Sequence, residues 1–278
     1  MNFNIITTSY NSEKTINDCF SSLNNQIYDK NNINWLLIDG ASKDNTVNLI
    51  KEFKSEINKK IISESDEGLY YAYNKGINKI TDKKNSVVNF LDSDNEYFSN
   101  DILNKVSEVF ETYDVDVVFT DLIYIGKNNK TLRFWNSKPD IKCSKKENDI
   151  YFYYNLNFFD HFLGWSMPLP AIFLKIETLN KCGFFDTKYK ICSDYDWSLR
   201  LSLIKNIKAA YIPKVSVRMR AGGVSNRFSN LLKIKIEDLK IIFNFYIKKN
   251  FVLAIFFCFF TLIFKNFRKI SQFFFKNR

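Results

Sequence analysis

Two aspartates, Asp92 and Asp94, follow the apolar run 86–91, which has the pattern of a buried strand. Two carboxylates this close repel each other unless a positive charge lies beside them. Mg²⁺ and Mn²⁺ take oxygen ligands, and Mg²⁺ is usually held by one or two carboxylates together with substrate phosphates. The pair is therefore a candidate site for a divalent cation and a diphosphate. An ordinary polar turn is the alternative, because the same residues are common there.

The residues around this pair alternate between strand and helix patterns. Apolar runs predict strands at 3–7, 33–40, 60–63 and 86–91. Apolar residues at helical spacing predict one helix with the face Ile16, Cys19, Phe20 and Leu23, a second with the face Val47, Ile50, Phe53 and Ile57, and a third over 69–79. This order is typical of an α/β fold, with a mainly parallel, Rossmann-like sheet flanked by helices.

Polar residues follow each of the four predicted strands. They are the segment 7–11, Asp39, the pair Glu64 and Asp66, and the pair Asp92 and Asp94. Ligands bind at the carboxyl ends of strands in open parallel sheets, so we expect all four groups at one edge. A helix cap is the better interpretation of Asp44 and Asp101, because a helix pattern begins at each. Four polar groups at one edge favour a ligand site.

The chain of 278 residues has a formal net charge of +10, which could indicate a nucleic-acid partner. However, 227–278 contains eleven Lys and Arg against Glu237 and Asp238, so residues 1–226 are nearly neutral. We therefore expect no nucleic-acid binding. Hydrophobic residues make up 46% of the chain, which excludes a disordered protein.

The cysteines and the single histidine do not suggest a zinc site. The five cysteines are an odd number and contain no CxxC pair. This usage is typical of a reduced, cytosolic setting. The first residues lack the basic start of a secretory leader, so we expect none.

Four stretches of the sequence together resemble a known family. They are IITTSYNSEKTINDCFSSLNNQ, LLIDGASKDNT, SESDEGLYYAYNKGI and NFLDSDNEYF. In this order and spacing they resemble the inverting family 2 glycosyltransferases of GT-A fold, in the branch found among bacterial surface-polysaccharide and O-antigen enzymes. The resemblance covers about residues 2–225. It implies a nucleotide-diphosphate sugar as the donor.

The resemblance implies roles for residues on the donor side. Thr8 and Tyr10 would lie beside the nucleotide base, with the Tyr10 ring stacked on it. Asp39 would accept a hydrogen bond from a base N–H, which suits uridine. The further donor-binding residues that it implies are Asp66, Asn74 and Lys75. An ordinary, partly buried Tyr10 and a solvated Lys75 are the alternatives.

The resemblance also implies a divalent cation, Mn²⁺ or Mg²⁺. It makes Asp94 the principal ligand and places Asp92 near the ribose or as a second ligand. The sequence departs from the family at two positions: Asn95 stands where an aspartate is frequent, and Tyr71 stands where an acid is frequent. The first bears on metal affinity and the second on the choice of sugar.

Inverting transfer needs a base that accepts the proton of the acceptor hydroxyl. Asp194 precedes a predicted helix whose inner face is Trp197, Leu201 and Ile204, at the place of an acidic motif of the family. The resemblance therefore assigns Asp194 as the base. An acid favoured by the helix dipole is the alternative. His161 is interpreted as structural, with a place in the acceptor pocket as the alternative.

The stretch 217–225 resembles a mobile loop on the acceptor side of the family. Arg218 or Arg220 would meet the diphosphate. Gly222 and Gly223 would let the backbone move or approach a substrate closely.

The chain divides by composition into two parts. We expect a catalytic domain at 1–226, with a donor half at 1–98 and an acceptor half at 99–226, followed by a basic, Phe-rich helical tail at 227–278. The apolar run 251–264 would form a helix of about 21 Å, whereas a hydrocarbon core is about 30 Å thick. We therefore expect a helix that lies in the membrane surface and does not span it.

A membrane-bound tail agrees with an acceptor that is a lipid-linked glycan. It places the protein at the cytoplasmic face of the inner membrane, as a peripheral or monotopic protein. Basic and Phe side chains would both contribute to attachment. A buried terminal helix or a dimer contact is the alternative for the tail.

Other classes of function fit the sequence less well. A nucleotidyltransferase would share the sheet and the paired acids, but its usual Gly-rich loop is missing from TTSYNSEK. A dehydrogenase would need GxGxxG after the first strand. A non-enzymatic membrane- or nucleic-acid-binding module would use the basic tail alone, and the nearly neutral main body disfavours it.

Overall fold

The computed structural model describes residues 1–278 except 82–84, 157, 223–229, 248–250 and 275–278. The described strands form one mixed sheet in the order β3 (Asn58–Ser63), β2 (Ile33–Asp39), β1 (Asn2–Ser9), β4 (Ser86–Phe90), β10 (Ile172–Lys175), β6 (Val117–Ile125), β11 (Lys208–Arg220), β9 (Ile150–Tyr154) and β8 (Lys145–Glu147). The short strand β5 (Asn95–Tyr97) pairs with β11, and β7 (Thr131–Trp135) pairs with β6.

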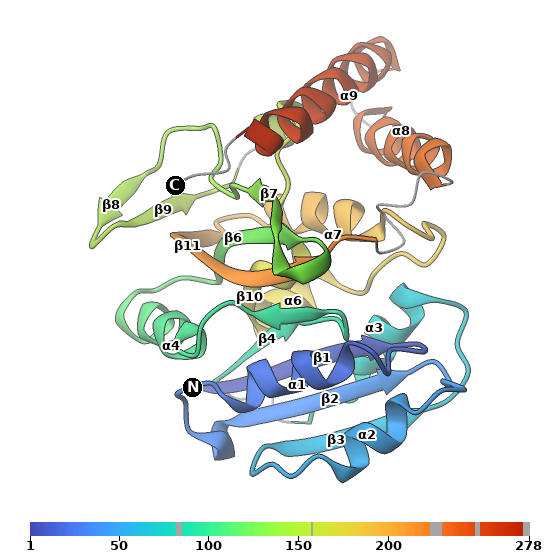
Figure 1. Ribbon diagram of the computed structural model, residues 1–278. Coiled ribbons are helices and arrows are strands. Elements are labelled where there is room, and N and C mark those ends of the chain that lie inside the picture. The colour runs from blue at the N-terminus through green and yellow to red at the C-terminus, as the bar shows by residue number, and fades with distance from the viewer. Residues whose placement is uncertain (82–84, 157, 223–229, 248–250, 275–278) are drawn as a thin grey trace.

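Helices cover both faces of the sheet (Figure 1). On one face, α1 (Ile16–Asn24), α2 (Thr46–Glu52) and α4 (Ile102–Thr112) share a core with Phe3 and Ile5 of β1. On the other face, α3 (Leu69–Asn78), α6 (Ile176–Cys182) and α7 (Ser193–Ser202) pack with Ile6. Side chains alternate between faces along a strand, so one apolar strand supplies both cores. The short helix α5 (Phe158–Phe162) lies near the C-terminal helices.

The donor half of the sheet confirms the predicted α/β order. β1, β2, β3 and β4 are present at the four predicted strands and run parallel. The register pairs Ser9 with Asp39 and Asp39 with Ser63, so three strands end at the same level. Helix α3 lies close to β1 because Gly76 has no side chain: a Cβ there would be 2.6 Å from Cγ2 of Ile6.

The prediction for the second helix is wrong at its C-terminal end. Helix α2 ends at Glu52, and Phe53 has an extended conformation, so Phe53 and Ile57 do not continue its face. The ammonium of Lys59 donates hydrogen bonds to the carbonyls of Ile50, at 2.7 Å, and Phe53, at 2.6 Å. These bonds satisfy carbonyls that a longer helix would have used itself.

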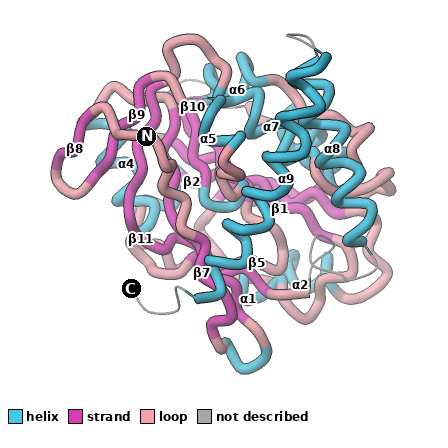
Figure 2. The backbone as a smooth tube through the Cα atoms, turned by 90° about the horizontal axis from the view of Figure 1, so that it is seen from above, coloured by secondary structure: helices cyan, strands magenta, loops and turns pink. Residues whose placement is uncertain are grey.

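The C-terminal residues form two helices that lie side by side, α8 (Leu231–Ile247) and α9 (Phe251–Phe274). In Figure 1 they lie at the end of the molecule opposite β3 and α2, and Figure 2 shows them beside α5 and α7. Residues of α7 and α8 join Ala254 and Cys258 of α9 in one apolar cluster. No helix in the described ranges has both the length and the apolar character that crossing a membrane requires.

Contacts join the predicted tail, 227–278, to the predicted catalytic domain, 1–226. Glu237 of α8 accepts three backbone hydrogen bonds of 2.9 Å, from Lys190, Ile191 and Cys192 at the entrance of α7. The tail therefore holds the segment that leads into the helix carrying Asp194. Sequence composition could not reveal this, because a basic, Phe-rich helix is equally compatible with a protein surface and a membrane.

Candidate active site

Asp39, at the end of β2, is fully buried and surrounded by hydroxyl groups. Ser9 donates its hydroxyl to Oδ1 at 2.9 Å, and Ser63 donates its hydroxyl to Oδ2 at 2.7 Å. Ser42 adds its backbone N–H, 2.9 Å from Oδ2, and its hydroxyl. A carboxylate can accept about four hydrogen bonds, so these four donors already satisfy Asp39. A base N–H could join Asp39 only if one of the hydroxyls turned away.

The side chains of Tyr10 and Asp66 both lie close to Gly40. A Cβ built on Gly40 would be 3.4 Å from the Tyr10 ring and 3.4 Å from a carboxylate oxygen of Asp66. The Tyr10 side chain is 63% exposed, so one side of its ring is open to a ligand. An exposed aromatic face beside a carboxylate suits a planar base with N–H groups. The structure thus brings together two of the sequence-predicted donor residues.

Asp92 is fixed by two hydroxyl groups at the carboxyl edge of the sheet. Its Oδ1 accepts hydrogen bonds from the Thr8 hydroxyl at 2.6 Å and the Tyr73 hydroxyl at 2.5 Å. Burial raises the pKa of Asp92, and the two hydrogen bonds oppose this rise. Thr8 therefore lies beside Asp92, and Tyr73 of α3 is a site residue that the sequence analysis did not identify.

Asp94 lies two residues further on and has a strongly perturbed acidity. Burial and the charge of Asp92 raise the pKa of Asp94 to about 7, while Arg220 opposes the rise. A cation beside Asp94 would relieve both unfavourable effects, so the oxygen donors present fit a hard divalent ion. Within the described ranges, no group of three or more His, Cys, Asp and Glu is arranged to hold a metal. Substrate phosphates and water would supply further oxygen ligands to a cation at Asp94.

Arg218 and Arg220 lie on β11, and the expectation that they belong to a mobile loop is wrong. Strand β11 pairs with β6 on one side and β5 on the other, so backbone hydrogen bonds hold both residues. Arg218 lies 3.7 Å from Glu96, and Arg220 lies 2.6 Å from Asp18. Gly222 follows the strand and has a φ of +114°, which glycine adopts readily because it lacks a Cβ. The space around it is open. The other predicted glycine, Gly223, lies outside the described residues.

Asn74 and Lys75 of α3 are engaged with other parts of the protein. The side-chain nitrogen of Asn74 donates to the carbonyl of Phe185, and the backbone N–H of Phe185 donates to the side-chain oxygen of Asn74, each at 2.8 Å. Lys75 lies 2.9 Å from Glu64. Their donor-binding roles stay predictions, and in this structure Asn74 joins α3 to the segment before α7.

Asp194 lies in the first turn of α7 rather than before the helix. Its Oδ1 accepts a hydrogen bond from the Tyr70 hydroxyl, 3.0 Å away, and that hydroxyl also lies 2.6 Å from the carbonyl of Ile191. Burial raises the pKa of Asp194, against the lowering effects of Tyr70 and Lys265. A raised pKa suits a group that must take up a proton. Of the predicted inner face of this helix, Trp197 and Leu201 are buried and Ile204 lies beyond its end.

Two tyrosines of α3 join the two carboxylate positions. Tyr73 donates to Asp92, and Tyr70, one turn earlier, donates to Asp194. Residues three apart on a helix lie on the same face, so the sequence spacing contains this signal. It was not recognised, because in YYAYNKG the same spacing also fits apolar packing.

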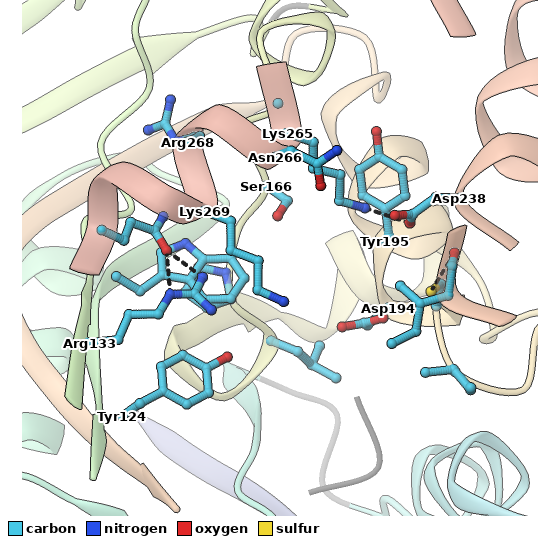
Figure 3. Close-up of a pocket in the computed structure, with 18 of the residues that line it drawn as sticks. Tyr124, Arg133, Ser166, Asp194, Tyr195, Asp238, Lys265, Asn266, Arg268 and Lys269 are labelled. Carbon is cyan, nitrogen blue, oxygen red and sulfur yellow. Dashed lines mark hydrogen bonds and ion pairs between the residues drawn. The ribbon is translucent and has the colours of Figure 1, made fainter. Parts of the chain in front are cut away.

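Asp194 lines a cavity of about 260 Å³ (Figure 3). Residues of β6, β7 and the segment 164–170 form part of the wall, and α8 and α9 complete it. Gly164 allows α9 to approach: its φ is +80°, and a Cβ there would lie 2.5 Å from the backbone nitrogen of Lys265. None of the sequence-predicted site residues lies in the tail, 227–278, although α8 and α9 line this cavity.

This chain is similar in sequence to a known family and to named proteins. Residues 4–165 match the model of the family described as Glycosyl transferase family 2. The minor teichoic acid biosynthesis protein GgaA of Bacillus subtilis (strain 168) is 25% identical over 275 residues, which are 96% of this chain and 55% of GgaA. The PGL/p-HBAD biosynthesis glycosyltransferase of Mycobacterium bovis (strain BCG / Pasteur 1173P2) is 22% identical over 229 residues, 81% of this chain and 79% of that protein. This chain thus spans about half the length of GgaA.

Solved structures confirm the predicted GT-A fold. The crystal structure of S. aureus TarS 1-349 in complex with UDP matches with a TM-score of 0.60 at 18% identity, over 86% of this chain and 66% of that one. The complex with UDP-GlcNAc matches with a TM-score of 0.62 at 16% identity, over 87% and 66% of the two chains.

Proposed function

This chain belongs to glycosyl transferase family 2, and from that premise we propose that it transfers a sugar from a UDP-sugar to a hydroxyl of a glycan, with inversion. The proposed reaction belongs to surface-polysaccharide biosynthesis. The UDP and UDP-GlcNAc complexes of TarS support the choice of donor. The names of GgaA and of the M. bovis glycosyltransferase support the process.

One observation carries this proposal: a single face of α3 holds both carboxylate positions of the reaction. Tyr73 fixes Asp92 on the donor side, and Tyr70 fixes Asp194 at the cavity. A reaction that joins two substrates needs its groups held at a set separation, and a helix turn is a rigid spacer. The exposed ring of Tyr10 and the carboxylate of Asp66 lie further along the carboxyl edge of the sheet and suit the binding of the nucleotide base.

In the proposed reaction, the acceptor hydroxyl attacks the anomeric carbon from the side opposite the nucleotide. A new carbon–oxygen bond forms, the bond from that carbon to the diphosphate breaks, and UDP leaves with the electron pair. Asp194 accepts the hydroxyl proton, and the Tyr70 hydrogen bond holds the accepting carboxylate in place. Asp94, with Asp92, would hold a divalent cation, Mn²⁺ or Mg²⁺, which when bound balances the charge of the diphosphate.

We propose further that the acceptor is lipid-linked and that α8 and α9 bring the enzyme to the cytoplasmic face of the inner membrane. The observation behind this is a set of exposed apolar side chains on the two helices. They are Leu232, Ile236, Leu239, Ile255, Phe256, Phe259, Ile263, Phe267 and Ile270. Apolar surface of this extent, next to basic residues, suits an anionic lipid surface.

The function is tested by incubating the full chain with UDP-sugars and glycolipids extracted from bacterial membranes. We expect UDP release together with glycolipid that has gained the mass of one sugar. Asp194→Asn should lower the rate by at least about 100-fold, because the amide does not accept the hydroxyl proton. UDP binding should stay intact, because Asn has nearly the same shape as Asp. Release of pyrophosphate or a nucleoside monophosphate instead of UDP would contradict the proposal. Full activity of Asp194→Asn would overturn the role of Asp194.

A further inference from the structure

The cavity beside Asp194 has more positive than negative side chains in its wall. The cationic side chains among the described lining residues are Arg133, Lys235, Lys265, Arg268 and Lys269. The acidic ones are Asp194 and Asp238. Four of the five cations come from α8 and α9, so the tail gives this cavity its charge. Neither the donor site nor the base role of Asp194 accounts for this excess.

Two of the five cations are paired with acids. Lys265 lies 2.5 Å from Asp238, whose side chain is only 2% exposed. Arg268 pairs with Asp140 and also donates to the carbonyl of Lys138 at 2.8 Å. These contacts attach α8 and α9 to each other and to the domain. They account for the presence of Lys265 and Arg268 without a ligand.

The contacts of Arg133 and Lys235 include neutral acceptors. Arg133 is buried against the rings of Tyr124 and Trp135, whose centroids lie 4.8 and 4.9 Å from its guanidinium carbon. It donates to the side-chain oxygen of Gln272 from Nε, at 2.7 Å, and also from Nη2. Lys235 donates to the amide oxygen of Asn266.

Lys269 extends from α9 into the cavity (Figure 3). Burial lowers the pKa of Lys269, and the charges of Arg133, Lys235 and Lys265 lower it further, while the charge of Asp238 opposes the fall. Positive charges gathered at a cavity wall repel one another unless an anion joins them. The arrangement is costly by itself and becomes favourable with a bound anion.

We propose that this cavity binds a phosphate group of the acceptor, held by Lys235, Lys269 and the guanidinium of Arg133. This inference rests on the proposed glycosyl transfer. A phosphate has the oxygens to accept from several cations at once. In Figure 3, Arg133 lies on the opposite side of the view from Asp194 and Asp238, and Lys269 extends from α9 into the space between them. A phosphate held by these cations would therefore lie in the cavity that Asp194 also lines.

The test measures binding of two phosphate esters to the full chain saturated with UDP. Glycerol 3-phosphate represents a polyol-phosphate chain, and farnesyl phosphate represents a lipid carrier. We expect at least one ester to bind, and Lys269→Gln to weaken its binding about tenfold, as loss of one charge-assisted contact should. Tighter binding of one ester names the source of the phosphate.

Lys240→Gln is the matched control, because Lys240 is an exposed lysine of α8 outside the cavity wall. It should leave ester binding unchanged, and all variants should bind UDP as the wild type does. Lys235→Gln provides a second cavity variant, and thermal unfolding shows that each variant is folded. Equal weakening of ester binding by Lys269→Gln and Lys240→Gln would show that the effect comes from the net charge of the protein and not from the cavity. That result would overturn the proposal.

Three further outcomes separate this inference from the proposed function. An ester that competes with UDP would mean that these cations serve the donor diphosphate, which overturns the inference. UDP binding without binding of either ester would also overturn it and leave the glycosyl transfer standing. Failure of UDP itself to bind would remove the proposed function, and the inference with it.

Discussion

The hydroxyl of Tyr70 lies 3.0 Å from Oδ1 of Asp194, and Tyr70 is thereby the contact through which α3 orients the proposed base. The same hydroxyl lies 2.6 Å from the carbonyl of Ile191, just before α7. Tyr70 therefore holds both the carboxylate and the backbone that leads to it. Its neighbour one turn on, Tyr73, holds Asp92 in the same way.

Tyr70→Phe should lower kcat about tenfold and leave the KM for the donor unchanged. A hydrogen bond to a charged group contributes about 1.5–3 kcal/mol, and only part of this is lost when water replaces the hydroxyl. The Tyr70 hydrogen bond lowers the pKa of Asp194, so its removal should move the acidic limb of the rate profile to higher pH. Initial rates across a pH series measure both effects. Tyr73→Phe should instead raise the donor KM, and an unchanged pH profile in Tyr70→Phe would contradict the role of Tyr70.

Gly164→Ala should destabilise the protein and loosen α9. Gly164 and Gly183 have nearly the same positive φ, +80° and +78°, so a Cβ strains the backbone at both. At Gly164 it would also meet the backbone of Lys265 at 2.5 Å, whereas at Gly183 the nearest atom is 3.8 Å away. We expect Gly164→Ala to lower the free energy of unfolding by about 1–3 kcal/mol more than Gly183→Ala.

Urea unfolding of the two glycine variants measures this difference, and limited trypsin digestion shows whether α9 is released. Faster cleavage in α9 is expected for Gly164→Ala alone. Equal destabilisation and equal cleavage of the two variants would show that α9 does not rest on Gly164.

His161 should make stability depend on pH below about 6.5. Burial lowers the pKa of His161 to about 3, with a smaller contribution from Lys265. The unfolded chain takes up this proton near pH 6.5, so between pH 6.5 and 3 the unfolded state binds more protons and stability falls as pH falls. Each pH unit in that range costs up to about 1.4 kcal/mol. In His161→Leu the free energy of unfolding should therefore fall less steeply between pH 7 and 5, and parallel slopes would contradict this.

Phe259→Ser with Phe267→Ser should weaken binding to anionic vesicles. These side chains on α9 are 62% and 72% exposed, and burying a Phe side chain contributes about 1.5–3 kcal/mol at most. We expect at least about a tenfold loss in vesicle co-sedimentation. Phe184→Ser is the control, because Phe184 is 49% exposed but lies outside the tail. An equal loss in the control, or none in the double variant, would remove the proposed membrane role of this face.

Local patterns in the sequence predicted the donor half of the fold well. Its parallel strands are apolar runs followed by polar residues, and the register then brings Asp39 beside Ser9 and Ser63 as the strand-end rule requires. The pairing of β11 with β5 could not be predicted in this way, because it joins Met219 to Asn95 across the chain. Pairing with β5 and β6 places Arg218 in a strand, and pairing with β6 does the same for Arg220, where a loop was expected.

The cavity beside Asp194 was the least predictable part of the candidate site. Asp194 was assigned through a family resemblance, whereas the cations around it depend on how α8 and α9 fold back. That packing is decided by contacts between distant residues, such as Glu237 with the backbone of Cys192 and Arg133 with Gln272. A composition that is basic and rich in Phe indicates a surface for attachment, but it does not identify the partner surface.

The most direct test of the central claim is a thermal-shift measurement with UDP, with and without Mn²⁺, on the wild type and Asp94→Asn. GDP, CDP and dTDP serve as controls for the preference among nucleotide bases. We expect UDP with Mn²⁺ to raise the unfolding temperature of the wild type, and the metal-dependent part of this rise to disappear in Asp94→Asn. A folded wild-type protein that no nucleotide stabilises would contradict the assignment of a nucleotide-sugar site to Asp92 and Asp94.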